Sequence, residues 1–303
     1  MKFLLSALMA TALMIGSMTS VRAEIYQQGI VYVNYEREGD AAVIATDVDN
    51  NGVPDVVEDI ATQINAARAV FHDEFGFPDP LGSARYKNVK TIEVDVCAKK
   101  DMNNQNGLAF SGVRKKSKHN PNESALHISI ASTADPHKNS TPTHEYFHLI
   151  QYGATYFRNG WYLEGMARWS QDAVQEIKKY PTDRNLSWTL KDKASEAKIF
   201  AGKYGVAKLL WYPLSVDLND KQKISSKLIK KYRYVDGAAV FKDNVFYGPN
   251  VMKRVLASMK SVEDEAANEF GGRKKWIKDG VRNAQNNKYI LKCVRDIYNE
   301  RRS

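Results

Sequence analysis

Residues 141–152, which read TPTHEYFHLIQY, constrain this chain more than any other segment because they contain His-Glu-x-x-His. On a helix, residues four apart lie on one face, so His144 and His148 can point imidazole nitrogens at one metal ion. Glu145 lies beside that face, where its carboxylate can reach a water bound to the metal. The spacing therefore predicts two zinc ligands and a general base from a single helical turn.

The neighbouring residues favour a helix over this segment. Pro142 suits a first helical turn, and Thr141 or Ser140 is available as the N-cap. The apolar surface that a buried helix needs would come from Tyr146, Phe147, Leu149 and Ile150. We therefore expect a largely buried helix.

A catalytic zinc usually has three protein ligands and one open position, so a third ligand is required. We expect it to be Glu164, because residues 161–169 predict the start of a second helix that folds back on the first. Gly165 and Ala167 are small enough to let the two helices approach closely. A solvated helix carboxylate is the alternative. The side chains that favour an enclosed position instead are Trp161, Leu163, Met166 and Trp169.

The sequence HEYFH followed by WxxEGxAxW resembles the gluzincin metallopeptidases. It is most similar to secreted bacterial enzymes with a Glu-Gly-x-Ala element, including collagenase-like peptidases and a group of bacterial metalloproteases known mainly from genomes. The resemblance implies a zincin-like α+β fold, with a mixed sheet and helices in the N-terminal half and a mainly helical C-terminal half. It also implies that His144, His148 and Glu164 bind zinc and that Glu145 is the general base.

The zinc motifs cover only residues 141 to about 172, and they depart from one branch of the family. Thermolysin-type enzymes place Asp four residues after the ligand Glu, where it orients a zinc-binding histidine. Here that position is Arg168. The residue that orients each histidine is therefore unassigned by the sequence.

Residues 1–23 predict a secretory signal peptide. Lys2 gives a positive start, residues 3–15 form an apolar run too short for a membrane span, and residues 21–23 read as a cleavage site. A buried first helix is the alternative, which the extreme N-terminal position disfavours. No later stretch is long and apolar enough to span a bilayer. We expect a secreted or periplasmic protein that starts near Glu24.

The formal net charge is +9, and it would fall to +7 on cleavage because Lys2 and Arg22 are removed. Much of the excess follows residue 220, as in residues 227–233 and 273–278, which we interpret as solvated helix faces. Attraction to acidic substrates or to an anionic envelope is the alternative. No nucleic-acid motif accompanies these segments, so we expect protein or peptide substrates and no nucleic-acid partner.

Residues 47–58, DVDNNGVPDVVE, match the twelve-residue pattern of a calcium loop. Gly52 permits the sharp turn at the sixth position. Oxygens would come from Asp47, Asp49, Asn51, the Val53 carbonyl, Asp55 and Glu58. The upstream segment looks like a strand, so we predict a single structural Ca²⁺ loop and no paired EF-hand. A polar turn that caps the next helix is the alternative. The secreted metalloproteases named above often carry a similar element.

The remaining pattern predicts a mixed N-terminal part, residues 24–152, and a mainly helical part, residues 153–303. Strands are expected within 24–45, 89–96, 107–113 and 126–132, and a helix over 55–76. Further helices are expected over 161–179, 203–214, 220–234, 249–259, 262–279 and 287–300. The resemblance implies that residues 125–132 form the cleft edge to which an extended substrate adds as a strand.

Several roles are left open by the sequence. Cys97 and Cys293 are expected either to form a disulfide or to be two separate buried thiols. His127 and His137 are more typical of packed or surface histidines than of ligands.

The donor that stabilises the oxyanion in a zinc peptidase is also unassigned, with Tyr204 and Tyr162 as candidates. Residues 203–214, which include Tyr204, are apolar and expected to be buried. Together, the motifs predict a secreted zinc-dependent endopeptidase. The alternatives are a non-catalytic or highly selective binding protein of the cell envelope on a zincin scaffold, or two coincidental metal motifs.

Overall fold

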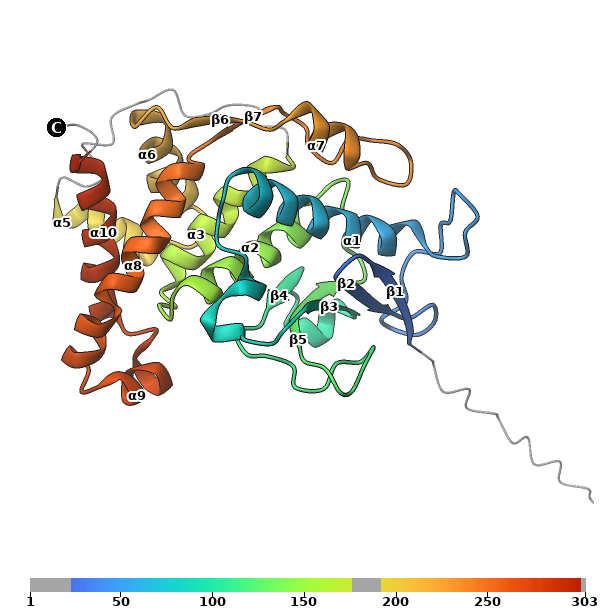
Figure 1. Ribbon diagram of the computed structural model, residues 1–303, viewed down its shortest axis with the longest axis horizontal. Coiled ribbons are helices and arrows are strands. Elements are labelled where there is room, and N and C mark those ends of the chain that lie inside the picture. The colour runs from blue at the N-terminus through green and yellow to red at the C-terminus, as the bar shows by residue number, and fades with distance from the viewer. Residues whose placement is uncertain (1–22, 176–191, 301–303) are drawn as a thin grey trace, which may run out of the picture.

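The computed structural model describes residues 23–175 and 192–300, and it shows a mixed α/β protein that is about half helical (Figure 1). Its main sheet has the strand order β1-β2-β3-β5-β4. The strands are β1 (Glu24–Gln28), β2 (Val31–Tyr35), β3 (Thr91–Cys97), β4 (Gly107–Ala109) and β5 (Ala125–Ala131). β2, β3 and β5 are parallel, and the two edge strands, β1 and β4, are antiparallel to their neighbours.

Each central strand alternates in character, which gives the sheet two different faces. In β5, Leu126, Ile128 and Ile130 are fully buried in the core, while His127 and Ser129 point to the opposite face. The apolar face is covered by α1 (Asp55–Arg68) and α2 (Thr141–Ala154), which pack against each other as well as against the strands (Figure 1).

The polar face of the sheet carries a charge network instead of an apolar layer. The Arg114 guanidinium binds Glu93 at 2.7 Å and Asp95 at 2.5 Å. Glu93 also accepts hydrogen bonds from Ser117 Oγ and the Lys118 backbone N–H, both at 2.6 Å. Despite burial, these donors hold the pKa of Glu93 down at about 2, so the carboxylate stays charged inside the protein.

α2 begins as the sequence predicts, with Pro142 in its first turn and Ser140 at the N-cap position. The Ser140 side chain makes no capping bond. Asn139 Oδ1 accepts the Thr141 backbone N–H instead, at 3.0 Å. The second helix, α3 (Gly160–Ser170), packs on α2 as expected.

The expected helix over 161–179 is shorter in the structure. α3 ends at Ser170 and is followed by one 3₁₀ turn, Gln171–Ala173. The end of the predicted helix, residues 176–179, lies outside the described residues.

The C-terminal part is mostly helical but contains a small second sheet that the sequence pattern did not reveal. Its elements are α5 (Lys193–Ala201), α6 (Tyr212–Asp217), β6 (Lys221–Lys223), α7 (Ser226–Lys231), β7 (Val245–Tyr247), α8 (Pro249–Glu269), α9 (Arg273–Lys275) and α10 (Asn287–Glu300). The segments just before α6 and after α9, Ala207–Trp211 and Trp276–Gly280, form π-helical turns.

Two predicted helix boundaries in this part are wrong. The helix expected over 220–234 is β6 followed by the short α7, because Ser225 caps α7 and both its N–H and its hydroxyl bind the Glu74 carboxylate. The break expected between 249–259 and 262–279 is absent, because α8 runs through it and ends before Gly271 and Gly272, and the rest of the second range forms α9 and the π-helical turn after it. Both glycines have the positive φ that stops a helix.

Cys97 and Cys293 are both unpaired, and burial raises the pKa of each thiol. The disulfide is therefore not formed, and the alternative of two separate thiols holds. No helix among the described residues is long and apolar enough to cross a membrane.

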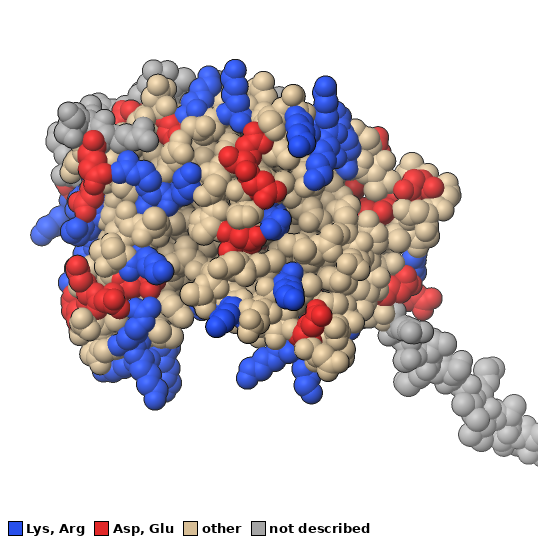
Figure 2. Space-filling view, viewed as in Figure 1, with Lys and Arg blue, Asp and Glu red and all other residues tan. Residues whose placement is uncertain are grey.

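Basic and acidic side chains alternate on the face shown in Figure 2, so no single-sign patch covers it. Part of the basic excess of the C-terminal half lies in exposed ion pairs, such as Lys292 with Asp296 at 2.8 Å and Arg273 with Asp264 at 2.7 Å.

Candidate metal centre and cleft

Three predicted ligands meet where α2 and α3 pack together. His144 Nε2 lies 3.1 Å from His148 Nε2 and 3.2 Å from Glu164 Oε2, and His148 Nε2 lies 3.7 Å from the same carboxylate oxygen. Bonds of about 2.1 Å at tetrahedral angles would place ligand atoms about 3.4 Å apart. The donor set and its spacing therefore fit zinc with one position left for a further ligand.

The approach of the two helices depends on Gly165, which follows Glu164. A Cβ at this position would lie 2.8 Å from the Trp211 indole nitrogen and 2.9 Å from Val206 Cβ. Only glycine lets the segment around Trp211 pack this closely on α3, and that packing holds Glu164 in place.

His148 is oriented by Gln151, one turn further along α2. Its Nδ1 lies 2.8 Å from Gln151 Oε1, and the Gln151 amide nitrogen in turn donates to the Leu163 carbonyl at 3.2 Å. Because that second bond fixes the amide, Oε1 accepts the Nδ1 proton and leaves a lone pair on Nε2. Gln151 was missed at the sequence level, although its place three residues after a predicted ligand is where such a partner can sit.

The surroundings of the centre keep His144 and Glu164 in their metal-binding forms, whereas the pKa of His148 is raised, because its hydrogen bond to Glu164 and the nearby carboxylate charges outweigh burial. Burial lowers the pKa of His144 to about 4, so its imidazole is neutral near pH 7. Burial alone would raise the pKa of Glu164, but its hydrogen bonds to the two histidines hold it well below the usual range. Arg168 binds Asp172 at 3.3 Å and does not orient either histidine.

Glu145 lies in the wall of a cleft of about 380 Å³ that also includes His144, Gly107 and Tyr204. Its side chain is 6% exposed, and burial raises its pKa to about 7. A Cβ on Gly107 would lie 2.5 Å from Thr141 Cγ2 and 2.6 Å from Glu145 Oε1. Glycine at this position of β4 is therefore needed for the carboxylate to occupy its place.

The structure distinguishes between the two tyrosines considered as oxyanion donors. Tyr204 is 55% exposed, contrary to the expectation that this segment is buried, and its ring centre lies 5.7 Å from that of His144. Tyr162 is fully buried in the core. Only Tyr204 reaches the cleft, because the turn at Gly205 carries it out of the apolar segment that follows.

The strand that borders the cleft is β4, not residues 125–132. β5 is an internal strand, with β3 on one side and β4 on the other. The edge role implied by the resemblance is therefore wrong for residues 125–132 and passes to β4, which is the edge strand of the sheet on this side.

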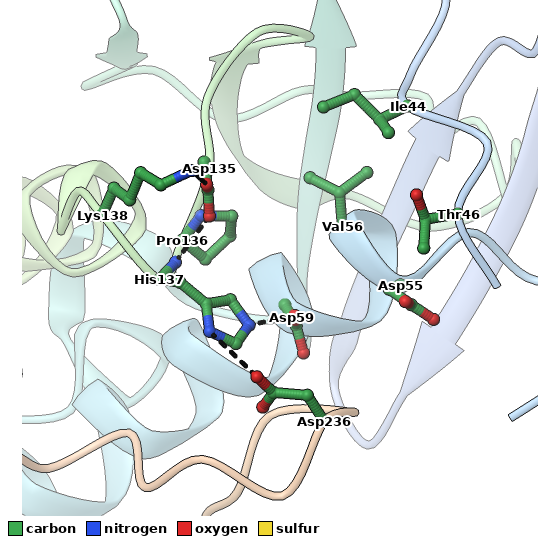
Figure 3. Close-up of a pocket in the computed structure, with 10 residues that line it drawn as sticks. All are labelled: Ile44, Thr46, Asp55, Val56, Asp59, Asp135, Pro136, His137, Lys138 and Asp236. Atoms are coloured by element: carbon green, nitrogen blue, oxygen red, sulfur yellow. Dashed lines mark hydrogen bonds and ion pairs between the residues drawn. The ribbon is translucent and has the colours of Figure 1, made fainter. Parts of the chain in front are cut away.

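His127 and His137 both lie away from the three-ligand cluster, in ion pairs. His127 Nε2 is 3.0 Å from Asp95 Oδ2, on the polar face of the sheet. His137 lines a separate hollow of about 400 Å³, where its Nε2 is 2.8 Å from Asp59 Oδ2 (Figure 3). Neither could ligate the same ion as His144 and His148.

The predicted calcium loop is gathered only in part. Carboxylate oxygens of Asp47, Asp49 and Asp55 lie within 4.8 Å of one another and form the second group able to hold a metal ion among the described residues. Glu58 is connected to the loop through the Asn51 amide nitrogen, at 3.1 Å.

Asn51 and Val53, two further predicted ligands of this loop, are hydrogen-bonded to each other. The Val53 backbone N–H donates to Asn51 Oδ1 at 2.8 Å, so that oxygen is already engaged. Gly52 has φ +87° with no atom within 4 Å of a built Cβ, which matches its predicted turn role.

No family model matches the chain, and no curated protein or solved structure shows significant similarity to it. The geometry and chemistry of the site are therefore the basis on which a function is assigned.

Proposed function

We propose that this protein is a secreted zinc-dependent endopeptidase with a zincin-like arrangement of its active site. The observation that carries the proposal is the convergence of His144, His148 and Glu164 from two packed helices beside a buried carboxylate, Glu145, in a cleft. Structural zinc sites are usually closed by four protein ligands, whereas three ligands beside an open cleft are typical of catalytic sites.

The three ligands would hold the metal. When bound, zinc would supply Lewis acidity that polarises a peptide carbonyl and makes water more acidic. Glu145 takes a proton from the attacking water on its carboxylate and delivers it to the leaving amine. The Tyr204 hydroxyl donates a hydrogen bond to the carbonyl oxygen as negative charge develops there.

The substrate backbone would lie along the edge of β4. An extended peptide that pairs with Gly107–Ala109 is held beside Glu145, because Gly107 is in contact range of that side chain. The enclosure of Glu145 keeps bulk water away from the proton transfer.

Cleavage of a denatured protein mixture tests the proposal. Mature protein purified with zinc should cut the mixture, and Glu145→Gln should not, while both retain one zinc per chain by elemental analysis. If both bind zinc and neither cuts, the protein is a non-catalytic zincin-like binding protein or cuts only a selected substrate. Absence of zinc from both would refute the metal centre altogether.

We also propose that residues 47–58 bind calcium as a structural ion. The support is the convergence of Asp47, Asp49 and Asp55 around one point at the start of α1. Hard carboxylate oxygens suit Ca²⁺, and the loop takes no part in the chemistry because it lies outside the cleft.

A further inference from the structure

A second hollow of about 350 Å³ lies beside the metal centre and is lined by three arginines, Arg85, Arg158 and Arg282. Tyr152 connects the two places. Its ring stacks on the ring of His148, with centres 5.8 Å apart, and the Arg158 guanidinium lies 4.3 Å from the centre of the same ring. We call this hollow the arginine pocket.

β4 and the residues after it join the arginine pocket to the cleft. Gly107, at the start of β4, lines the cleft that contains Glu145. Ala109, Phe110 and Ser111 line the arginine pocket. A peptide that pairs with this edge beside Glu145 would therefore extend into the arginine pocket within a few residues, since a strand advances about 3.3 Å per residue.

Arg158 is the central group of the pocket. It is 6% exposed, and its Nη1 donates to the carbonyls of Thr155 at 2.9 Å and Phe157 at 2.7 Å. Its Nη2 is buried and has no hydrogen-bond partner. A buried cation with an unused donor is costly unless an anion completes it, so this atom marks the place of a missing partner.

The neighbouring arginines supply no compensation. Arg85 donates to the Tyr152 carbonyl at 3.0 Å, and its guanidinium lies over the Tyr156 ring. In residues 23–175 and 192–300, no carboxylate forms an ion pair with Arg85, Arg158 or Arg282. Burial and then the charge of Arg85 lower the pKa of Arg158 to about 10, which still leaves it charged near pH 7.

Arg114 is another enclosed arginine of this protein, but carboxylates of the protein itself neutralise its charge. Its guanidinium is half-enclosed on the polar face of the sheet, and Glu93 and Asp95 neutralise it directly. The arginine pocket has similar enclosure and more positive charge but no internal anion. A group of arginines without a carboxylate partner is typical of a site that binds an anion from another molecule.

We propose that the arginine pocket is a substrate subsite that binds the carboxylate of an Asp or Glu side chain a few residues from the cleaved bond. Planar guanidinium groups pair with carboxylates through two parallel hydrogen bonds, and Arg158 Nη2 has no hydrogen-bond partner among the described residues. This inference rests on the proposed peptidase function and adds its preferred substrate class, acidic peptides.

The test starts from the cut sites in a proteome-derived peptide library. An acidic residue should recur at one fixed position relative to the cleaved bond. A peptide with Glu at that position should then have a kcat/KM about tenfold or more above its Gln counterpart, as expected for a charge-assisted contact. Both peptides are made with free and with amidated C-termini. A preference that vanishes on amidation would assign the carboxylate to the peptide terminus and overturn the side-chain proposal.

Two substitutions in the pocket and one outside it complete the design. Arg85→Gln and Arg158→Gln should each reduce the Glu-over-Gln preference toward one, while Arg158→Lys should keep part of it. Arg233→Gln is the matched control, because Arg233 is exposed and donates only to the Gly237 carbonyl. Arg85→Gln keeps the test valid if Arg158→Gln does not fold. An unchanged preference in both pocket variants refutes the subsite.

Binding separates failure of the subsite from failure of the peptidase. Fluorescence anisotropy with labelled peptides on zinc-loaded Glu145→Gln should show tighter binding of the Glu peptide than of the Gln peptide. Acid-selective binding without cleavage by the wild type would refute the peptidase and leave the anion site standing. Cleavage without any acidic preference would refute the subsite and leave the peptidase standing.

Discussion

The protein presents two groups of side chains that could hold a metal ion, and the two groups differ in how they are held. His144, His148 and Glu164 are anchored on two packed helices, where the histidines are 6% and 4% exposed. Asp47 and Asp49 lie on a loop, where Asp47 is half-buried and Asp49 is exposed. The helical group is placed by the core before any ion binds, whereas the loop group is held mainly by its own hydrogen bonds.

This difference predicts different consequences of binding. In a preorganised site, little of the binding free energy is used to order the ligand side chains, so most of it appears as affinity. A loop site converts binding into local order and into stability of the folded state. Zinc should therefore bind tightly with little change in the fold, and calcium should bind more weakly and raise the melting temperature.

The largest expected effect comes from removing one helical ligand. His148→Ala should lower zinc affinity by more than about 100-fold, since even loss of an orienting partner costs that much. Zinc content measured after dialysis against a competing chelator reports the loss. His137→Ala is the control, because His137 pairs with Asp59 away from the centre. Retention of stoichiometric zinc by His148→Ala would show that the metal is held elsewhere.

The orienting role of Gln151 gives the next effect. Gln151→Leu removes the acceptor for His148 Nδ1 and the bond to the Leu163 carbonyl, and we expect zinc affinity to fall by about 10- to 100-fold. Gln151→Glu keeps an acceptor oxygen and should retain more of the affinity. Equal affinities in all three proteins would mean that packing alone orients the histidine.

The sequence anticipated the helical group well because its information is local. Spacing on one helix places His144 next to His148, and an apolar environment 16 residues after His148 identifies Glu164. The strand order could not be read in this way, since β4 reaches the edge only through its pairing with β5. The arginine pocket depends on three distant segments meeting, which no local pattern contains.

The end of α3 and the exposure of Tyr204 also could not be predicted from the local sequence. α3 ends at Ser170 although the pattern continues, because the chain turns there into the 3₁₀ segment Gln171–Ala173. Tyr204 belongs to an apolar stretch, yet its side chain is mostly exposed because the chain turns at Gly205 before the buried residues. In both cases tertiary packing overrides the structural preference of the local sequence.

A third prediction concerns Gly107, the glycine beside the Glu145 carboxylate. Gly107→Ala would push a Cβ into Thr141 and Glu145, which we expect to cost about 1–3 kcal/mol of stability and most of the peptidase activity. Zinc content should be unchanged, because no ligand atom is displaced. Gly112→Ala is the matched control on the same segment, where a Cβ meets nothing within 4 Å. Full activity of Gly107→Ala would separate Glu145 from catalysis.

The smallest expected effect is that of calcium binding at the loop, residues 47–58. Calcium at ten times its Kd should stabilise the fold by about 1.4 kcal/mol, seen as a rise in Tm. Asp49→Ala should abolish that rise, because it removes one of the three gathered carboxylates, and it should leave zinc content untouched. Asp236→Ala, which removes an exposed carboxylate near His137, is the control.

Because the loop precedes α1, and α1 packs directly on α2, a calcium effect on zinc affinity would show that the two sites are coupled through these helices. Independent responses would show that the loop stabilises only its own end of the fold.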